Sequence, residues 1–243
     1  YLQAKYPQYF YKELKPFFTP EQSNQFLAEI RDPAKYELNR KIGENDNLIC
    51  ELIRLDKANE FTTQLSIYKM PLESLIPTSI YETNSLLIKK TPTLIEYTAF
   101  FGSIEVFRYL ATNIPAVRSP TWIFGIHSPN TNMVKLLEFN KIPPEDLTYK
   151  ECIRESIKCH HNEIINFFLK DYFKKDPASL LFLFSQCLRY YNFSHILVDN
   201  IKKSHFYLLC KYDYIAFVDI LLNTMGVEVN HTTVSKNNYL IQF

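Results

Sequence analysis

Glycine is scarce in this sequence, with only 4 in 243 residues, against a usual share of about 7%. The sequence contains neither G-x-G-x-x-G nor G-x-x-x-x-G-K-[ST], so it lacks the glycine-rich loops whose backbone N–H groups bind phosphate. Folds rich in β-hairpins also use glycine in their turns. The shortage therefore argues against nucleotide-binding enzymes and against sheet-rich folds.

The sequence also lacks an excess of charge and a long apolar run. It carries 27 basic and 26 acidic residues, for a net charge of +1, whereas a nucleic-acid-binding domain usually shows a basic stripe. No apolar run approaches the ~18 residues of a membrane span, and we expect no signal peptide. The five cysteines are odd in number and lie in apolar segments, which is typical of reduced core residues. We therefore expect an intracellular, cytoplasmic protein with no nucleic-acid and no membrane partner.

Apolar residues make up 47% of the chain, with 19 Phe and 17 Tyr, and their spacing predicts helices. The stretch from Thr93 to Leu110 reads as two short helices with a tight turn at Gly102. Two helices of about eight residues are not stable alone in water. We therefore expect neighbouring helical pairs that are built in the same way.

The same pattern returns at three later points, with turns near Pro129, His160 and Asp213. Between the last two, the apolar unit from Leu180 to Val198 has no turn that aligns with the others, and Asp176-Pro177 predicts its helix start. Two slots of the pattern are apolar in all four clear copies, and we expect the first set to be buried between adjacent units: Phe107, Val134, Ile165 and Val218, followed by Leu110, Leu137, Phe168 and Leu221.

These residues resemble an ankyrin repeat, whose pattern is T-P-L-H-x-A-A-x-x-G-H-x-E-I-V-K-x-L-L. The matching residues of the first copy are Thr93, Ile95, Ala99, Gly102, Glu105, Val106, Phe107, Arg108 and Leu110. The end of the last copy, residues 221–230, resembles the ankyrin ending L-L-x-x-G-A-D-V-N. Leu94 and Glu96 depart from the usual Pro and His, and most spacings are shorter than about 33 residues. Phrases around residues 49–52, 81–84 and 155–162 are similar to an ankyrin family of parasitic protists that has a divergent helical N-terminal region.

The resemblance implies an all-α fold, an ankyrin-like helical-repeat solenoid with a divergent helical N-terminal cap. Residues 1–90 would form the cap, and residues 91–243 about five repeats with the last incomplete. Residues 233–243 look like the start of another repeat, so we expect the natural protein to continue. Within the cap, Thr19-Pro20 and Asp32-Pro33 predict two helix starts, and residues 48–55 and 61–68 predict a helical pair.

The chain offers little that indicates catalysis or metal binding. One cluster, Cys152, Cys159, His160 and His161, contains metal-ligating residue types, but its spacing differs from the C-x₂₋₄-C pairs of zinc sites. The carboxylates are scattered singly, and no cysteine is marked as an activated nucleophile. We expect no enzymatic activity, no cofactor and no bound metal.

The resemblance implies a protein-protein interaction module that binds a protein partner on the concave face of its array. In ankyrin repeats the variable first-helix positions are the residue before the Ala pair and the two after it, and they line this face. Carried over, the positions are Tyr97, Phe100, Phe101, Phe124, His127, Ser128, Glu155, Lys158, Cys159, Leu208, Lys211 and Tyr212.

Three alternatives stay open at this point. Phe100 and Phe101 could pack against the cap instead of a partner, because a large exposed apolar patch needs a reason. The protein could be a structural scaffold that self-associates through its open C-terminal repeat. It could also be an enzyme or a metal-binding protein with a site between cap and solenoid. Trp122, the single tryptophan, is expected in the core, and the alternative is an anchor at a binding surface.

Overall fold

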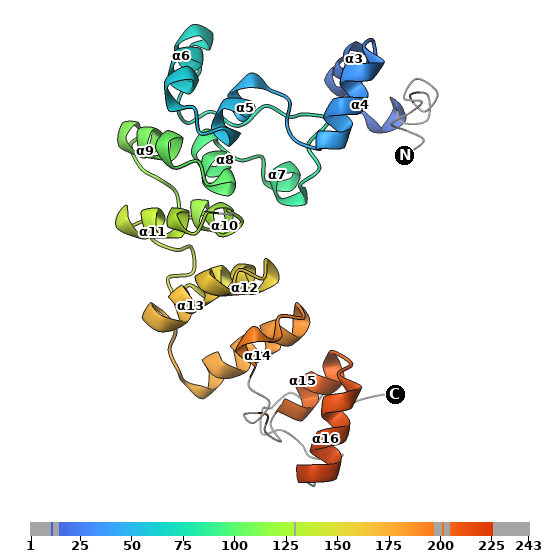
Figure 1. Cartoon of the computed structure of the whole chain (residues 1–243), viewed down its shortest axis with the longest axis vertical. Coiled ribbons are helices and arrows are strands. Elements are labelled where there is room, and N and C mark those ends of the chain that lie inside the picture. Colours follow the sequence, from blue (N-terminus) through green and yellow to red (C-terminus); the bar gives the residue numbers. More distant parts are fainter. Residues whose placement is uncertain (1–10, 12–14, 129, 197–200, 202–204, 226–243) are drawn as a thin grey trace. The chain divides into compact units, whose positions relative to one another are not determined.

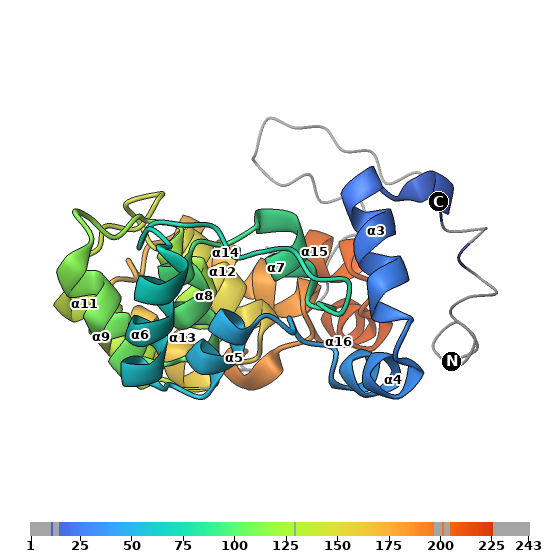
Figure 2. The ribbon, with the colours of Figure 1, turned by 90° about the horizontal axis from the view of Figure 1, so that it is seen from above.

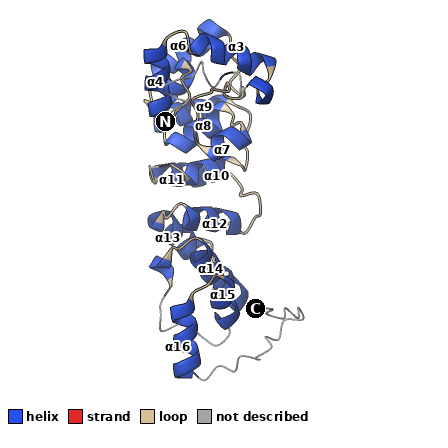
Figure 3. Cartoon of the chain, turned by 90° about the vertical axis from the view of Figure 1, so that its right-hand side faces the viewer, coloured by secondary structure: helices blue, strands red, loops and turns tan. Residues whose placement is uncertain are grey.

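A computed structural model describes residues 11, 15–128, 130–196, 201 and 205–225. Helices joined by loops form this part of the chain, and it contains no strand (Figure 3). The expected all-α fold is therefore confirmed for the described residues, none of whose helices is long and apolar enough to cross a membrane. The chain divides into two compact units, Tyr1–Pro143 and Pro144–Phe243. The division between cap and repeats near residue 90 falls inside the first unit and stays a prediction.

The first unit begins with η1 (Lys15–Phe17), α3 (Pro20–Glu29) and α4 (Pro33–Ile42). A capping box starts α3: the Gln22 N–H donates to Thr19 Oγ1, and the Thr19 N–H donates to Gln22 Oε1. Asp32 caps α4 in the same sense, by accepting from the Lys35 N–H. Both predicted helix starts are confirmed. The two helices lie beside each other (Figure 2) and share a small core of Phe26, Ile30, Tyr36 and Tyr81.

Three helical pairs follow in the described part of the first unit, and Figure 1 labels their helices. They are α5 (Leu48–Arg54) with α6 (Ala58–Tyr68), α8 (Leu94–Phe101) with α9 (Ile104–Asn113), and α10 (Thr121–Ile126) with α11 (Asn132–Phe139). The short helix α7 (Ser85–Lys90) lies in the long connection between the first two pairs. Helix α8 packs against α5 and against α10, so residues 94–99 are all buried. Trp122 is buried as expected, and its indole N–H donates to the carbonyl of Ile142.

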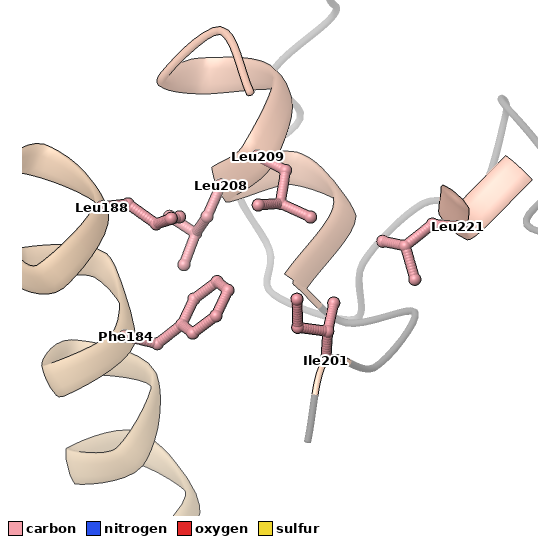
Figure 4. Packing of buried hydrophobic residues seen from close by; sticks show 6 residues of the cluster. All are labelled: Phe184, Leu188, Ile201, Leu208, Leu209 and Leu221. Atoms are coloured by element: carbon pink, nitrogen blue, oxygen red, sulfur yellow. The ribbon is translucent and has the colours of Figure 1, made fainter. Parts of the chain in front are cut away.

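The second unit also consists of helical pairs. They are α12 (Lys150–Lys158) with α13 (Asn162–Asp171), α14 (Pro177–Arg189) with the short η2 (Phe193–His195), and α15 (Phe206–Lys211) with α16 (Ile215–Met225). Helix α14 contacts both α12 and α15. Figure 4 shows Phe184 and Leu188 of α14 beside Leu208 and Leu209 of α15, in one apolar core. The predicted start of α14 is confirmed, because Asp176 accepts from the Ser179 N–H.

Five of the helical pairs share one turn. In each turn, a residue with positive φ follows the first helix, and one more residue then precedes the next helical element. The N–H of the positive-φ residue donates to the carbonyl three residues back, and the following N–H donates to the carbonyl five residues back. These two bonds define a Schellman motif. The positive-φ residues, called turn residues below, have φ between 51° and 71° and are Asp56, Gly102, His160, Tyr191 and Asp213.

The shared turn confirms the predicted turns at Gly102, His160 and Asp213, and it supplies the turn that the sequence did not align. Tyr191, 31 residues after His160, is the turn residue between α14 and η2. Asp56 shows that the pair α5–α6, in the predicted cap, uses the same turn. Pro129 lies outside the described residues, as do residues 226–230 of the ending that was predicted over residues 221–230.

The predicted core slots are confirmed with one exception. Phe107, Val134 and Ile165 are buried, and the second slot is buried in all four copies. Val218 is only half-buried, so the expectation of full burial there is wrong. Helix α16 packs against α15, and within the described part of its unit no helix follows it to cover its other side. Ile215, the first residue of α16, is 71% exposed.

Candidate functional site

The predicted partner-binding residues stand five, two and one residues before each turn residue. Among the five shared turns, the residue five places back is buried at Tyr97, Gln186 and Leu208, half-buried at Glu155 and exposed at Glu51. Phe124, predicted at the equivalent position of α10, is 3% exposed. This position lies one helical turn back from the end of the first helix, where neighbouring helices cover it. Tyr97, Phe124 and Leu208 are therefore core residues, and the prediction that they lie on the partner surface is wrong.

Tyr97 has a specific buried environment. Its hydroxyl oxygen accepts a hydrogen bond of 2.9 Å from Nη1 of Arg54, and its ring centroid lies 4.7 Å from that of Phe101. Burial raises the pKa of the Tyr97 hydroxyl, so it stays protonated. Arg54 is held in turn by Glu44, at 2.8 Å from its Nε. Tyr97 thus links α8 to α5 through Arg54 and does not face a partner.

In the first unit, the positions two and one residues before the turn form a connected aromatic group. Phe100 and Phe101 are half-buried and in edge contact, at 5.0 Å between centroids. Phe100 stacks on His127, with centroids 5.5 Å apart and planes 20° apart. The Arg54 guanidinium lies over the Phe101 ring at 5.9 Å. We call Arg54, Phe100, Phe101 and His127 the unit 1 row; Ser128, also predicted, is buried.

The alternative that Phe100 and Phe101 pack against the predicted cap holds for Phe101 only. Phe101 packs on Arg54 of α5, which belongs to the region predicted as the cap. Phe100 instead contacts Phe101 and His127, on the side of α10. The aromatic pair is thus supported from both neighbouring helices, and part of its surface stays accessible to solvent.

In the second unit, the position two residues before the turn residue is always basic, and the position one residue before it is a cysteine or a tyrosine. Lys158, Arg189 and Lys211 are exposed, and each stands two residues before its turn residue. Cys159, Tyr190 and Tyr212 stand one residue before it and are half-buried. We call Lys158, Arg189, Tyr190, Lys211 and Tyr212 the unit 2 row.

Arg189 and Tyr190 are absent from the sequence-based prediction. They were missed because a tyrosine occupies the turn position, and bulky residues rarely adopt positive φ. The signal that could have found them is spacing: Tyr191 follows His160 by the 31 residues that separate Pro129 from His160.

Side-chain hydrogen bonds join consecutive turns within each unit. Three donors directly follow a turn residue, and each donates to the carbonyl three residues before the preceding turn residue. They are Ser103 to Ile53 at 2.5 Å, Asn192 to Ile157 at 3.2 Å and Tyr214 to Leu188 at 2.6 Å. Consecutive first helices therefore end side by side, which places the members of each row next to one another. In the first unit, Asn130 also donates to the carbonyl of Gly102 at 3.4 Å.

The cysteines have the character of core residues. Burial raises the pKa of Cys50, Cys152 and Cys187 to about 12, and that of Cys159 to about 11. Such thiols are protonated at neutral pH, and a protonated thiol is a poor nucleophile and a poor metal ligand. Of the predicted cluster, Cys152 lies inside α12, Cys159 ends it, and His160 and His161 form the turn to α13.

Comparison of the chain with known proteins gives no identity. No family model, no curated protein and no solved structure matches it.

Proposed function

We propose that this chain is a non-enzymatic protein-interaction module built from ankyrin-like helical pairs, and that it binds a protein partner with the ends of its first helices. The observation that carries the proposal is the alignment of these ends. The shared turn recurs in both units, and bonds between consecutive turns hold neighbouring helix ends together. In a helical-repeat solenoid of the ankyrin type, these ends line the concave face.

The chemistry of the two rows supports a protein partner. Aromatic and arginine side chains are enriched among the residues that dominate interface energies. Phe100, Phe101, Tyr190 and Tyr212 are half-buried, so their rings are already held by neighbours while part of each stays accessible. A ring that is held in place loses little conformational entropy when a partner binds.

The test compares captured proteins from a cell lysate, with the full chain as bait. The aromatic variant is Phe100→Ala, Tyr190→Ala and Tyr212→Ala together. A control variant removes exposed aromatics elsewhere, through Phe17→Ala, Tyr68→Ala and Phe139→Ala. We expect the aromatic variant, but not the control variant, to lose a protein that the unmodified chain captures. Both variants should keep the melting temperature of the unmodified chain within a few degrees. Equal capture by both variants would contradict the proposal.

Self-association is a second candidate function, favoured by the apolar side chains that α16 exposes among the described residues. Ile215 is exposed there and Val218 is half-buried, although Val218 stands in a slot that is buried in the other copies. Sedimentation of the full chain over a dilution series would show a dimer that dissociates, and Ile215→Asp would weaken it. A constant monomer mass would exclude this candidate.

A further inference from the structure

The unit 2 row differs from the unit 1 row in its charge. Lys158, Arg189 and Lys211 occupy the same position on three consecutive first helices, α12, α14 and α15. We propose that the unit 2 row binds an acidic, extended segment of a partner protein. This inference rests on the proposed function, and it names the chemical class of the partner.

The three cations differ in how much of their charge is already used. Lys158 Nζ lies 2.7 Å from Glu155 Oε1. No acidic side chain of the described residues pairs with Arg189 or Lys211, which lie over tyrosine rings instead. The Arg189 guanidinium is 5.5 Å from the Tyr190 centroid, and Lys211 Nζ is 5.7 Å from that of Tyr212. Two cations are thus available to a ligand and are held in place by aromatic faces.

The row is continuous across the three helices. Asn192 joins the turn of α14 to that of α12, and Tyr214 joins the turn of α15 to that of α14. The Tyr212 hydroxyl also lies 3.4 Å from the Ser185 hydroxyl of α14. Acidic groups beside the row are Glu155, which Lys158 engages, and the exposed Asp213. Three cations against two carboxylates leave the row basic.

The spacing of the cations suits an extended peptide. Packed helices lie about 8–10 Å apart, and an extended chain advances about 3.3 Å per residue. An acidic residue at every third position would therefore meet one cation on each helix, and the hydroxyl groups of Tyr190 and Tyr212 could donate to the same carboxylates. A nucleic acid fits less well, because its affinity depends on many phosphate contacts, and the whole chain carries a net charge of only +1.

The experiment measures fluorescence anisotropy with the full chain and a labelled synthetic peptide of repeated Glu-Ser-Leu. A matched peptide carries Gln in place of every Glu. We expect the Glu peptide to bind at least about tenfold more tightly, a difference of about 1.4 kcal/mol, and to weaken as salt rises. The row variant Lys158→Gln/Arg189→Gln/Lys211→Gln should abolish this difference. The control variant Lys170→Gln/Lys174→Gln/Lys175→Gln, with the same change in net charge at exposed positions, should keep it.

Several outcomes would overturn the proposal. If the control variant loses as much binding as the row variant, the effect is one of overall charge. If Glu and Gln peptides bind equally and the row variant weakens both, the acidic class is wrong while the proposed function stands. If a labelled single-stranded oligonucleotide binds through the row more tightly than the Glu peptide, the row is a nucleic-acid surface. If neither peptide binds, the acidic segment is excluded, and the lysate experiment decides separately whether the proposed function survives.

Discussion

The hydroxyl of Tyr214 donates a hydrogen bond of 2.6 Å to the carbonyl oxygen of Leu188. Leu188 stands three residues before the turn residue Tyr191, and Tyr214 stands one residue after the turn residue Asp213. Asn192 and Ile157 repeat the relationship one pair earlier, with an amide as the donor. The same geometry is thus reached with different side chains, which indicates that the position, rather than the residue type, sets the contact between pairs.

Removal of the Tyr214 hydroxyl should weaken the second unit without changing its core. Tyr214→Phe keeps the ring and leaves the Leu188 carbonyl without this donor, which costs about 1 kcal/mol for a typical hydrogen bond. Urea unfolding of the full chain would measure the loss. The control is Tyr191→Phe, because Tyr191 is 69% exposed. Equal stability of Tyr214→Phe and the unmodified chain would show that the bond contributes nothing.

Equivalent core positions should respond unequally to truncation. Phe107 has no exposed surface, so Phe107→Ala should cost about 3–5 kcal/mol, as for other buried aromatics. Val218 is half-buried in the same slot, so Val218→Ala should cost about 1 kcal/mol or less. Chemical denaturation followed by circular dichroism would measure both. A loss below about 1 kcal/mol for Phe107→Ala would mean that the core has been misassigned.

Glycine exchanges at the turn residue should act in opposite directions. His160 has a φ of 57°, a left-handed conformation that costs a residue with a β-carbon about 1–2 kcal/mol. Glycine avoids this cost but loses about 0.5–1 kcal/mol through its greater freedom in the unfolded chain. His160→Gly should therefore raise stability by about 0.5–1 kcal/mol. Gly102 has a φ of 71°, and an added Cβ would lie 2.8 Å from Cβ of Asn130. Gly102→Ala should therefore cost about 2 kcal/mol or more. Melting temperatures would show the two signs, and the same sign for both would argue against a shared turn.

The buried thiols should react slowly, and they should make the fold sensitive to alkaline pH. Burial raises the pKa of Cys50, Cys152 and Cys187 from 9.0 to about 12. The folded state then binds these protons more tightly than the unfolded state, so their contribution to stability is complete below pH 9 and is lost between pH 9 and about 12. Iodoacetamide at pH 8, followed by mass spectrometry, should label the half-buried Cys159 and Cys210 first. Early labelling of Cys50 would contradict its placement in the core.

The sequence predicts those parts of the fold that depend on local chemistry. Thr19-Pro20 and Asp176-Pro177 predict helix starts because the Thr19 and Asp176 side chains accept hydrogen bonds from N–H groups of the first helical turn. Gly102 predicts a turn because glycine adopts positive φ without strain. The equivalent turn at Tyr191 makes the same backbone bonds, but it places a bulky tyrosine at positive φ, which no local sequence pattern marks.

The candidate surface was predictable only in part, for a related physical reason. The pattern places Tyr97, Phe100 and Phe101 on one first helix, but it does not say how deeply neighbouring helices cover each residue. Arg54, distant in the sequence, donates a hydrogen bond to the buried Tyr97 hydroxyl and lies over the half-buried ring of Phe101. Arg189 and Tyr190 join the surface only once the turn at Tyr191 fixes their position.

The bonds between turns also have a direction along the chain. In each case the carbonyl that accepts belongs to the earlier pair and the donor to the later one: Ile53 before Ser103, Ile157 before Asn192, and Leu188 before Tyr214. During synthesis the accepting pair leaves the ribosome first, and folding of nascent chains generally begins at the N-terminal side. When each new turn emerges, the segment that carries its acceptor has therefore already left the ribosome, so within a unit the pairs can assemble in the order of translation.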